Sequence, residues 1–200
     1  MKNSIDFYFD FSSPYGYFAS CRIDQIAGRH GRSVVWRPYL MGAVFKVTGR
    51  GPLPEQPLVG DYARRDFLRS ARLHSIPFQM PARLPISAVG PSRAYYWLQG
   101  QDAEKAKALA RALYSAYFVG GRDISEPAQI AVVAESFGVE QAVLANALQD
   151  PAVKERLRQE TDAAIARGVF GSPFVIVDDE PFWGNDRLDQ VDRWLARGGW

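Results

Sequence analysis

Apolar and polar residues alternate at the start of the chain in a way that is typical of a β-strand. Residues 5–11 read Ile-Asp-Phe-Tyr-Phe-Asp-Phe, with an apolar side chain at every odd position. This period of two, with its aromatic and β-branched residues, predicts a strand with one face in the core. The strand stops at two serines followed by Pro14, and the pair Ser13-Pro14 is a signal for the start of a helix.

The next stretch changes to a helical period. Its apolar side chains recur every three or four residues and predict a helix from Pro14 to about Gly28. Residues 33–38 then form a second short apolar run that a proline closes, which predicts another strand. A strand, a helix and a strand in this order favour parallel pairing of the two strands through a right-handed crossover.

The middle of the chain is predicted to be helical. Residues 42–60 contain glycine and proline at close spacing, so we expect them to be irregular. Beyond them, strong helix formers and helix-start signals predict a series of helices. The expected helices span Tyr62 to His74, Pro91 to Gln99, Asp102 to Phe118, Glu126 to Phe137, Glu140 to Leu148 and Ala152 to Gly168.

The end of the chain returns to strand patterning. Residues 174–177 read Phe-Val-Ile-Val, and an acidic turn separates them from a second short run at 181–183, which predicts a hairpin. A final helix with an apolar stripe is expected after Asp186.

This order of elements is that of an α/β, thioredoxin-like fold with a large all-helical insertion. We expect residues 1–45 and 169–200 to form a discontinuous thioredoxin-like domain. Residues 46–168 would form the helical insertion domain with its connecting segments.

Composition and charge narrow the classes of function. The 200 residues include 24 basic and 22 acidic side chains, a formal net charge of +2, which gives no reason to expect a nucleic-acid partner. The first residues lack the apolar segment of a secretory signal, and no apolar run approaches the roughly 20 residues that cross a bilayer. We therefore expect a cytoplasmic protein with no membrane partner.

A single cysteine, Cys21, limits thiol and metal chemistry further. One thiol cannot form an internal disulfide or a redox pair, and with only two histidines no metal site is expected. The reactive position of a thioredoxin-like domain is the start of the first helix, where free N–H groups stabilise an anion. Ser12 and Ser13 lie there, before Pro14 and Tyr15, and either hydroxyl could serve. Cys21 is about two turns further along and is expected to be a small buried side chain. A thiol–disulfide oxidoreductase is therefore disfavoured.

Five blocks along the chain carry a resemblance to a known family, and those at the two ends are the most specific. They are residues 6–15, 42–49, 76–81, 168–174 and 182–188. The first reads Asp-Phe-Tyr-Phe-Asp-Phe-Ser-Ser-Pro-Tyr, and the last reads Phe-Trp-Gly-Asn-Asp-Arg-Leu. In these blocks the chain resembles the 2-hydroxychromene-2-carboxylate isomerases, which belong with proteins related to the DsbA oxidoreductases and the kappa-class glutathione transferases.

The resemblance implies a glutathione site, which would bring in the thiol that the chain lacks. Ser13 would be the catalytic residue and would hold the glutathione sulfur as a thiolate. A cis peptide bond before Pro173 would leave the backbone of Ser172 free to pair with the cysteinyl part of glutathione. Asn185 and Asp186 would bind its γ-glutamyl end.

Lys46 would bind a carboxylate of glutathione or of the substrate. The residues by themselves also have ordinary structural interpretations. Ser13 suits an N-cap, Asn185 and Asp186 suit the start of the last helix, Pro173 suits the start of a strand, and Lys46 suits a solvated surface.

The activity implied is the glutathione-dependent cis–trans isomerisation of an aromatic catabolite, carried out by a homodimer. The substrate would be a 2-hydroxychromene-2-carboxylate or its ring-opened hydroxybenzylidenepyruvate. Two alternatives stay open, a kappa-like glutathione transferase or peroxidase and a non-catalytic thiol- or peptide-binding module.

The substrate region is where the chain departs from the family pattern. Arg50 stands where a small or amide side chain is expected, and Ser87 lies where related proteins tend to carry asparagine. Candidate substrate contacts are Arg64, Arg65, Arg69 and Arg72 on one predicted helical face, and His74, Tyr95, Tyr96 and Trp97. A solvated face and core packing are the alternatives for these two groups.

Overall fold

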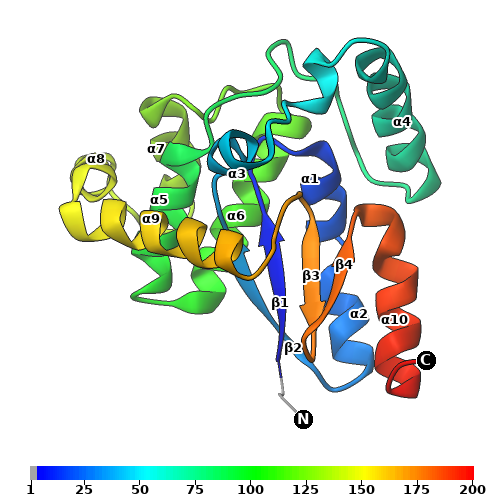
Figure 1. Cartoon of the computed structure of the whole chain (residues 1–200). Coiled ribbons are helices and arrows are strands. Elements are labelled where there is room, and N and C mark those ends of the chain that lie inside the picture. The colour runs from blue at the N-terminus through cyan, green and yellow to red at the C-terminus, as the bar shows by residue number, and fades with distance from the viewer. Residues whose placement is uncertain (1–3) are drawn as a thin grey trace.

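Four strands form one mixed sheet at the centre of the fold (Figure 1). The computed structural model describes residues 4–200, and the strand order is β2-β1-β3-β4. β1 (Ser4–Phe9) pairs in parallel with β2 (Ser33–Pro38) and antiparallel with β3 (Phe174–Val177), whose other neighbour is the edge strand β4 (Glu180–Trp183). The predicted strand–helix–strand unit and the C-terminal hairpin are confirmed.

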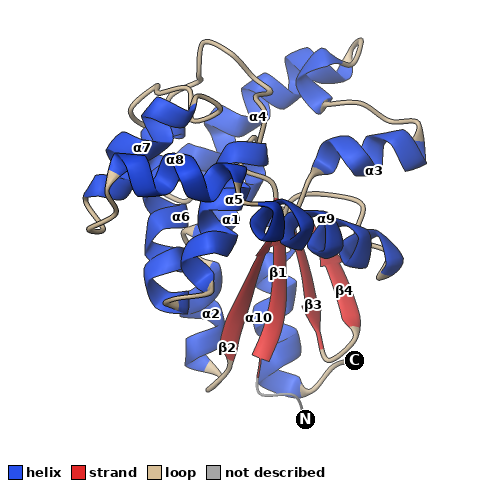
Figure 2. Ribbon diagram, turned by 90° about the vertical axis from the view of Figure 1, so that its left-hand side faces the viewer, coloured by secondary structure: helices blue, strands red, loops and turns tan. Residues whose placement is uncertain are grey.

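Helices cover both faces of this sheet (Figure 2). Each helix predicted in the middle of the chain has a counterpart between α4 and α9. In chain order the helices are α1 (Pro14–Ser20), α2 (Ile23–Arg29), α3 (Met41–Thr48), α4 (Val59–Leu73), α5 (Val89–Gln99), α6 (Ala103–Phe118), α7 (Pro127–Glu135), α8 (Gln141–Gln149), α9 (Pro151–Ala166) and α10 (Leu188–Arg197), with short 3-10 turns at Leu53–Glu55 and Asn185–Arg187.

The alternation of side chains along β1 places a core on each face of the sheet. Ile5, Phe7 and Phe9 are buried on one face, in a large apolar cluster shared with α1, α2, α6 and α10. Tyr8 belongs to a smaller cluster on the other face, with Ala164 of α9 among its members. A strand covered on both sides explains why even the position between two phenylalanines is aromatic.

Three buried tyrosines fasten the sheet to the helical block. Tyr95 and Tyr96 on α5 donate their hydroxyl protons to two backbone carbonyls of β2, over 2.9 and 2.7 Å. Tyr114 on α6 donates to the carbonyl of Asp10, just beyond β1, over 2.9 Å. Tyr95 and Tyr96 are therefore core residues, which is the alternative that the sequence left open for them.

The helix predicted from Pro14 to Gly28 is divided into two, and Cys21 lies at the break. α1 ends at Ser20, and the backbone N–H of Arg22 bonds to the carbonyl three residues earlier over 3.0 Å. Cys21 is the residue that caps the end of α1, outside the packed face of either helix, and it is exposed. The expectation of a buried side chain is wrong because it assumed one continuous helix.

Residues 42–60 are also more regular than predicted. α3 occupies Met41–Thr48, since the first proline of this region, Pro52, comes only after the helix has ended. Gly49 ends the helix with a left-handed backbone (φ 70°), a conformation that glycine adopts without steric cost. The glycines and prolines of this region therefore mark the end of a helix and the loop that follows it.

α3 and α4 pass over the end of the sheet at which β1 stops and α1 begins (Figure 1). The loop between them packs closely on α4. A Cβ atom at Gly60, the second residue of α4, would lie 2.6 Å from the carbonyl oxygen of Pro54. This contact fixes the position of the loop against the N-terminal end of α4.

Two expectations concern the chain as a whole. Within residues 4–200, none of the helices combines the length and the apolar character needed to cross a membrane. The division into domains at residues 45/46 and 168/169 stays a prediction.

We predict that Gly60→Ala destabilises the protein by about 1–3 kcal/mol, because the added methyl group must displace a backbone carbonyl. Gly42→Ala is the matched control, since Gly42 is also the second residue of a helix but a Cβ there meets nothing within 4 Å. The control variant should be neutral or slightly stabilised, as alanine favours a helix over glycine. Urea denaturation measures both free energies of unfolding, and equal values would contradict the close contact.

Candidate functional site

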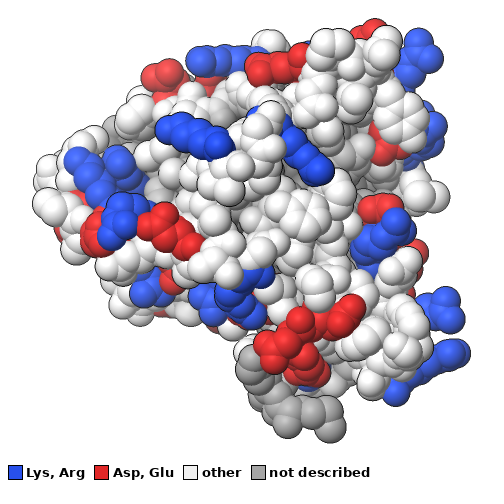
Figure 3. All heavy atoms as spheres, viewed as in Figure 1, with Lys and Arg blue, Asp and Glu red and all other residues white. Residues whose placement is uncertain are grey.

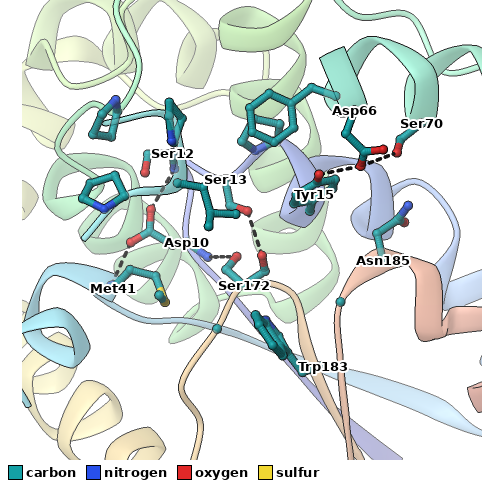
Figure 4. A pocket seen from close by; sticks show the side chains of 18 of the residues that line it. Asp10, Ser12, Ser13, Tyr15, Met41, Asp66, Ser70, Ser172, Trp183 and Asn185 are labelled. Carbon is teal, nitrogen blue, oxygen red and sulfur yellow. Dashed lines mark hydrogen bonds between the residues drawn. The ribbon is translucent and has the colours of Figure 1, made fainter. Parts of the chain in front are cut away.

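A buried carboxylate, that of Asp10, organises the turn between β1 and α1. Its Oδ1 accepts the backbone N–H of Ser12 over 2.8 Å, and its Oδ2 accepts the backbone N–H of Met41, the first residue of α3, over 3.0 Å. Burial raises the pKa of Asp10, and the donors from Met41 and Ser12 offset part of this rise. The side chain thereby joins α3 to the start of α1 (Figure 4).

Ser13 is the N-cap of α1, as its sequence context predicts, and its hydroxyl has two partners. The Oγ accepts the backbone N–H of Gly16 over 3.0 Å. The same hydroxyl donates its proton to the carbonyl oxygen of Ser172 over 2.9 Å. Because the side chain is only half-buried, a bound molecule can reach it.

The segment before β3 lies beside this turn (Figure 4). The Ser172–Pro173 peptide bond is cis, as the family resemblance implies. Ser172 Oγ accepts the backbone N–H of Asp10 over 2.9 Å, and the carbonyl of Pro173 accepts the backbone N–H of Gly184 over 3.0 Å. Three segments that are distant in the sequence therefore meet around Ser13.

A cavity of about 770 Å³ adjoins these segments. Its volume is in the range of small-molecule sites in proteins. The lining comes from the turn after β1, from α3 and α4 with the loop between them, and from the segments on either side of the C-terminal hairpin. Apolar contributors include Tyr15, Phe45, Leu53, Tyr62, Phe67, Leu73, Leu84, Phe170 and Trp183; polar ones include Ser12, Ser13, Asp66, Ser172, Asn185 and Asp186.

Asn185 and Asp186 both line the cavity but differ in exposure. Asn185 retains only 4% of its surface accessibility, and its Oδ1 has no hydrogen-bond partner among residues 4–200. Its side chain points toward the space beside Tyr15 (Figure 4). Asp186 is exposed, with a carboxylate oxygen 3.4 Å from Nη1 of Arg187. The turn thus offers one buried acceptor without a partner and one exposed negative charge.

The remaining candidates from the sequence lie elsewhere. Lys46 is exposed on α3 and is not among the cavity-lining residues, although Phe45 beside it is. Pro173 is buried behind Ser172. Of the four arginines on α4, only Arg69 lines the cavity, and His74 and Trp97 do not. The roles in binding that the resemblance implies for Lys46 and Pro173 stay predictions.

A hydrogen bond within the cavity lining joins α1 to α4, and sequence reasoning did not predict its two residues. Tyr15 donates its hydroxyl proton to Asp66 Oδ2 over 2.6 Å, and the ring of Tyr15 packs on Phe67 with centroids 4.9 Å apart. Burial raises the pKa of Asp66, but the hydrogen bonds from Tyr15 and Arg69 outweigh this effect and hold the pKa below its usual range. The position of Tyr15 directly after the Ser-Pro pair was the one signal available in the sequence.

The arrangement suits the binding of an organic molecule with both polar and apolar parts. A hydroxyl donor, a buried acceptor and an exposed carboxylate lie around one cavity, and the walls are largely aromatic and aliphatic. In the described part of the chain, no group of three or more His, Cys, Asp or Glu side chains could hold a metal ion.

Comparison with known proteins gives a consistent result. Residues 4–196 match the family of DSBA-like thioredoxin domains. The chain is 31% identical over 201 residues to a 2-hydroxychromene-2-carboxylate isomerase of Sphingobium xenophagum, covering 98% of this chain and 99% of that one. It is 30% identical over 208 residues to glutathione S-transferase kappa 2 of Caenorhabditis elegans, covering 98% and 92%.

A solved structure of a 2-hydroxychromene-2-carboxylate isomerase is similar in fold. It superposes with a TM-score of 0.81 at 30% identity and covers 97% of this chain and 95% of its own. The predicted thioredoxin-like fold with its helical insertion is therefore confirmed, as is the resemblance to these isomerases and to kappa-class transferases.

We predict that Tyr15→Phe lowers the free energy of unfolding by about 1 kcal/mol at neutral pH, because Asp66 loses a hydrogen bond to its charged form. An aspartate whose pKa is lowered in the folded state stabilises the protein above its unfolded pKa of about 3.9, and this stability is lost as the pH falls through the folded value. The difference between wild type and variant should therefore shrink in acid.

Tyr62→Phe is the control for this experiment. Tyr62 lies on α4 in the same cavity wall, is exposed, and makes no hydrogen bond through its hydroxyl with residues 4–200. Its removal should leave stability unchanged across the pH range. A Tyr15→Phe difference that does not depend on pH would contradict the assignment to Asp66.

Proposed function

We propose that this chain, which belongs to the family of DSBA-like thioredoxin domains, is a glutathione-dependent cis–trans isomerase of aromatic compounds of the 2-hydroxychromene-2-carboxylate type. The observation that carries the proposal is the hydroxyl of Ser13, which lies at the start of α1 beside the carbonyl of Ser172 and on the wall of a large cavity. Cys21, the one cysteine of the chain, lies at the other end of α1 and outside this lining.

The residues of the cavity fit glutathione. The unpartnered Oδ1 of Asn185 can accept a hydrogen bond from the ammonium of the γ-glutamyl end, and the exposed carboxylate of Asp186 can pair with its charge. Gly171, which also lines the cavity, packs directly against the indole ring of Trp183. A Cβ atom at residue 171 would lie 2.0 Å from Nε1 of that ring, so glycine is needed there. A buried acceptor without a partner costs free energy in the unbound protein, which a ligand with an N–H donor recovers.

When bound, glutathione supplies a nucleophilic sulfur that adds reversibly to a conjugated double bond, so that the bond can rotate before the sulfur leaves. The role of the Ser13 hydroxyl is to stabilise this sulfur as a thiolate. A hydroxyl that donates a hydrogen bond to the charged form of a thiol lowers the thiol pKa. The apolar walls of the cavity hold the aromatic body and exclude water from the reacting atoms.

Ser13 can serve this role through an exchange of partners. Its one hydroxyl proton goes to the carbonyl of Ser172 in this structure, and its Oγ accepts from Gly16. When the proton turns to the sulfur, the carbonyl of Ser172 becomes free to accept a backbone N–H of the cysteinyl part. The hydroxyl keeps an acceptor and the carbonyl of Ser172 keeps a donor, so the exchange leaves neither group without a partner.

A kappa-like glutathione transferase is the second candidate. The identity to the Caenorhabditis elegans transferase is 30%, close to the 31% identity to the Sphingobium xenophagum isomerase. The two activities differ in the fate of glutathione, which an isomerase returns and a transferase consumes. Assay of free glutathione during turnover separates them, and binding without turnover would indicate a binding module.

We also infer a homodimer that works in the cytoplasm. α3, α4 and the residue before α4 expose apolar side chains, among them Val47 with 67%, Leu58 with 94% and Leu73 with 74% of their surface accessible. Exposed apolar groups on one side of a protein favour association with a second copy. The cytoplasm is the compartment in which glutathione is kept reduced.

We predict that Ser13→Ala raises the thiol pKa of bound glutathione by about one to two units and lowers turnover about 10- to 100-fold. The thiolate is followed by its ultraviolet absorbance as the pH is varied. Ser12→Ala is the control, because Ser12 also lines the cavity but does not cap α1. The proposal is wrong if the wild-type protein binds no glutathione, or if the Ser13→Ala complex titrates like the wild type.

We predict that Asn185→Ala raises the dissociation constant of glutathione about tenfold. The same variant should leave the unliganded protein at least as stable as the wild type, because the lost Oδ1 has no partner within residues 4–200. Calorimetric titration and thermal unfolding measure the two effects. Asn146→Ala, at an exposed position of α8, should change neither; a large loss of stability in Asn185→Ala would assign the side chain to the fold instead.

A further inference from the structure

Among residues 4–200, the charged side chains that line the cavity leave one cation, that of Arg50, without a partner. Nε and Nη2 of Arg69 bond to Asp66 Oδ1 over 3.0 and 2.6 Å, and Nη1 of Arg187 lies 3.4 Å from Asp186. The guanidinium of Arg50 makes no hydrogen bond or ion pair with any of residues 4–200. Its charge is therefore available to a ligand.

The third acid of the lining does not neutralise this charge. Asp10 is buried and takes hydrogen bonds from the backbone N–H groups of Ser12 and Met41. In the space-filling view, the surface around α3 is largely uncharged, apart from isolated basic side chains (Figure 3). On this side of the cavity the visible charges are therefore basic, which favours the approach of a negatively charged group.

The backbone that carries Arg50 is held in place. Gly49 ends α3 immediately before it, and the Nε2 of Gln56 donates a hydrogen bond to the carbonyl of Gly51 over 2.6 Å. Residues 52–54, Pro-Leu-Pro, lie between these contacts and also line the cavity. The prolines and this hydrogen bond reduce the conformational freedom of the loop. The backbone of Arg50 therefore keeps a fixed position in the cavity lining.

We propose that Arg50 binds the carboxylate of the second substrate and thereby selects an apolar, aromatic molecule with one carboxylate over its uncharged analogues. The inference rests on the proposed function, because it takes the ligand to be the co-substrate of glutathione. A guanidinium binds a carboxylate through two parallel N–H···O hydrogen bonds, which fix the orientation as well as the position of the ligand.

The surroundings of Arg50 favour the co-substrate over glutathione itself, which also carries carboxylates. Arg50 belongs to the connection between α3 and α4, and the lining that this connection and the two helices supply includes Phe45, Leu53 and Tyr62. The polar groups suited to glutathione come from other segments, the start of α1, the residue before the cis-proline and the turn at Asn185–Arg187. An apolar body with a charged end matches this side of the cavity.

The test compares two unreactive probes of the same shape, 2-naphthoate and 2-naphthamide, by calorimetric titration of the full-length protein with and without glutathione. The wild type should bind naphthoate more tightly than naphthamide. Arg50→Ala should raise the dissociation constant of naphthoate about tenfold and leave that of naphthamide unchanged. Arg50→Lys should recover part of the preference, since it keeps the charge but loses the paired hydrogen bonds.

Arg64→Ala is the matched control, because Arg64 is an exposed arginine of α4 outside the cavity lining. It should leave the binding of both probes unchanged. The proposal is overturned if the wild type shows no preference for naphthoate, if Arg50→Ala weakens both probes equally, or if it weakens glutathione and neither probe, which would assign Arg50 to a glutathione carboxylate. Because no probe reacts, the result stands whether or not the Ser13→Ala experiment supports the isomerase.

Discussion

The hydrogen bonds of Asp10 are the constraint on which the rest of the site depends. Its backbone N–H bonds to Ser172, its carbonyl accepts from Ser13 and Tyr114, and its carboxylate accepts from Met41. These partners come from the first helix, the helical block, α3 and the segment before β3. Because buried polar groups are costly without partners, none of these segments can move away unless another donor or acceptor takes its place.

The cavity next to this residue has two sides of different origin. The side with Ser13, Ser172 and Asn185 is made by the start of α1, the segment before β3 and the turn before α10, which contribute hydroxyl, amide and backbone groups. The other side is made by α3, α4 and their loop, which contribute aromatic and aliphatic groups together with Arg50. Under the proposed function, the groups that would bind glutathione and those that would select the substrate belong to different parts of the chain, so the two properties can change independently.

The sequence predicts those features of the site that local signals determine. The period of two in β1, the Ser-Pro pair and the short apolar run of β3 place Ser13 and Ser172 at the ends of neighbouring elements. The pairing of Asp10 with Met41, and of Tyr15 with Asp66, depends on contacts between distant segments, for which one sequence carries no signal.

The helical phase of α3 explains why Phe45 lines the cavity and Lys46 does not. Met41 and Phe45 are four residues apart on α3 and share the face that lines the cavity, whereas Lys46 lies about 100° further around the helix. The sequence predicts an irregular segment at residues 42–60, so it places neither α3 nor the face that this helix turns to the cavity. The break between α1 and α2 is of the same kind, since no glycine or proline marks it.

The exposed position of Cys21 leaves the thiol open to a labelling reagent, although partial burial raises the pKa of this thiol, so labelling is favoured by a pH above neutral. A thiol-reactive fluorophore would attach at one place, because the chain has a single cysteine. That place is eight residues beyond Ser13, or about 12 Å along a helix axis at 1.5 Å per residue. An environment-sensitive dye there would lie outside the cavity yet near enough to follow ligand entry in real time, without any engineered residue.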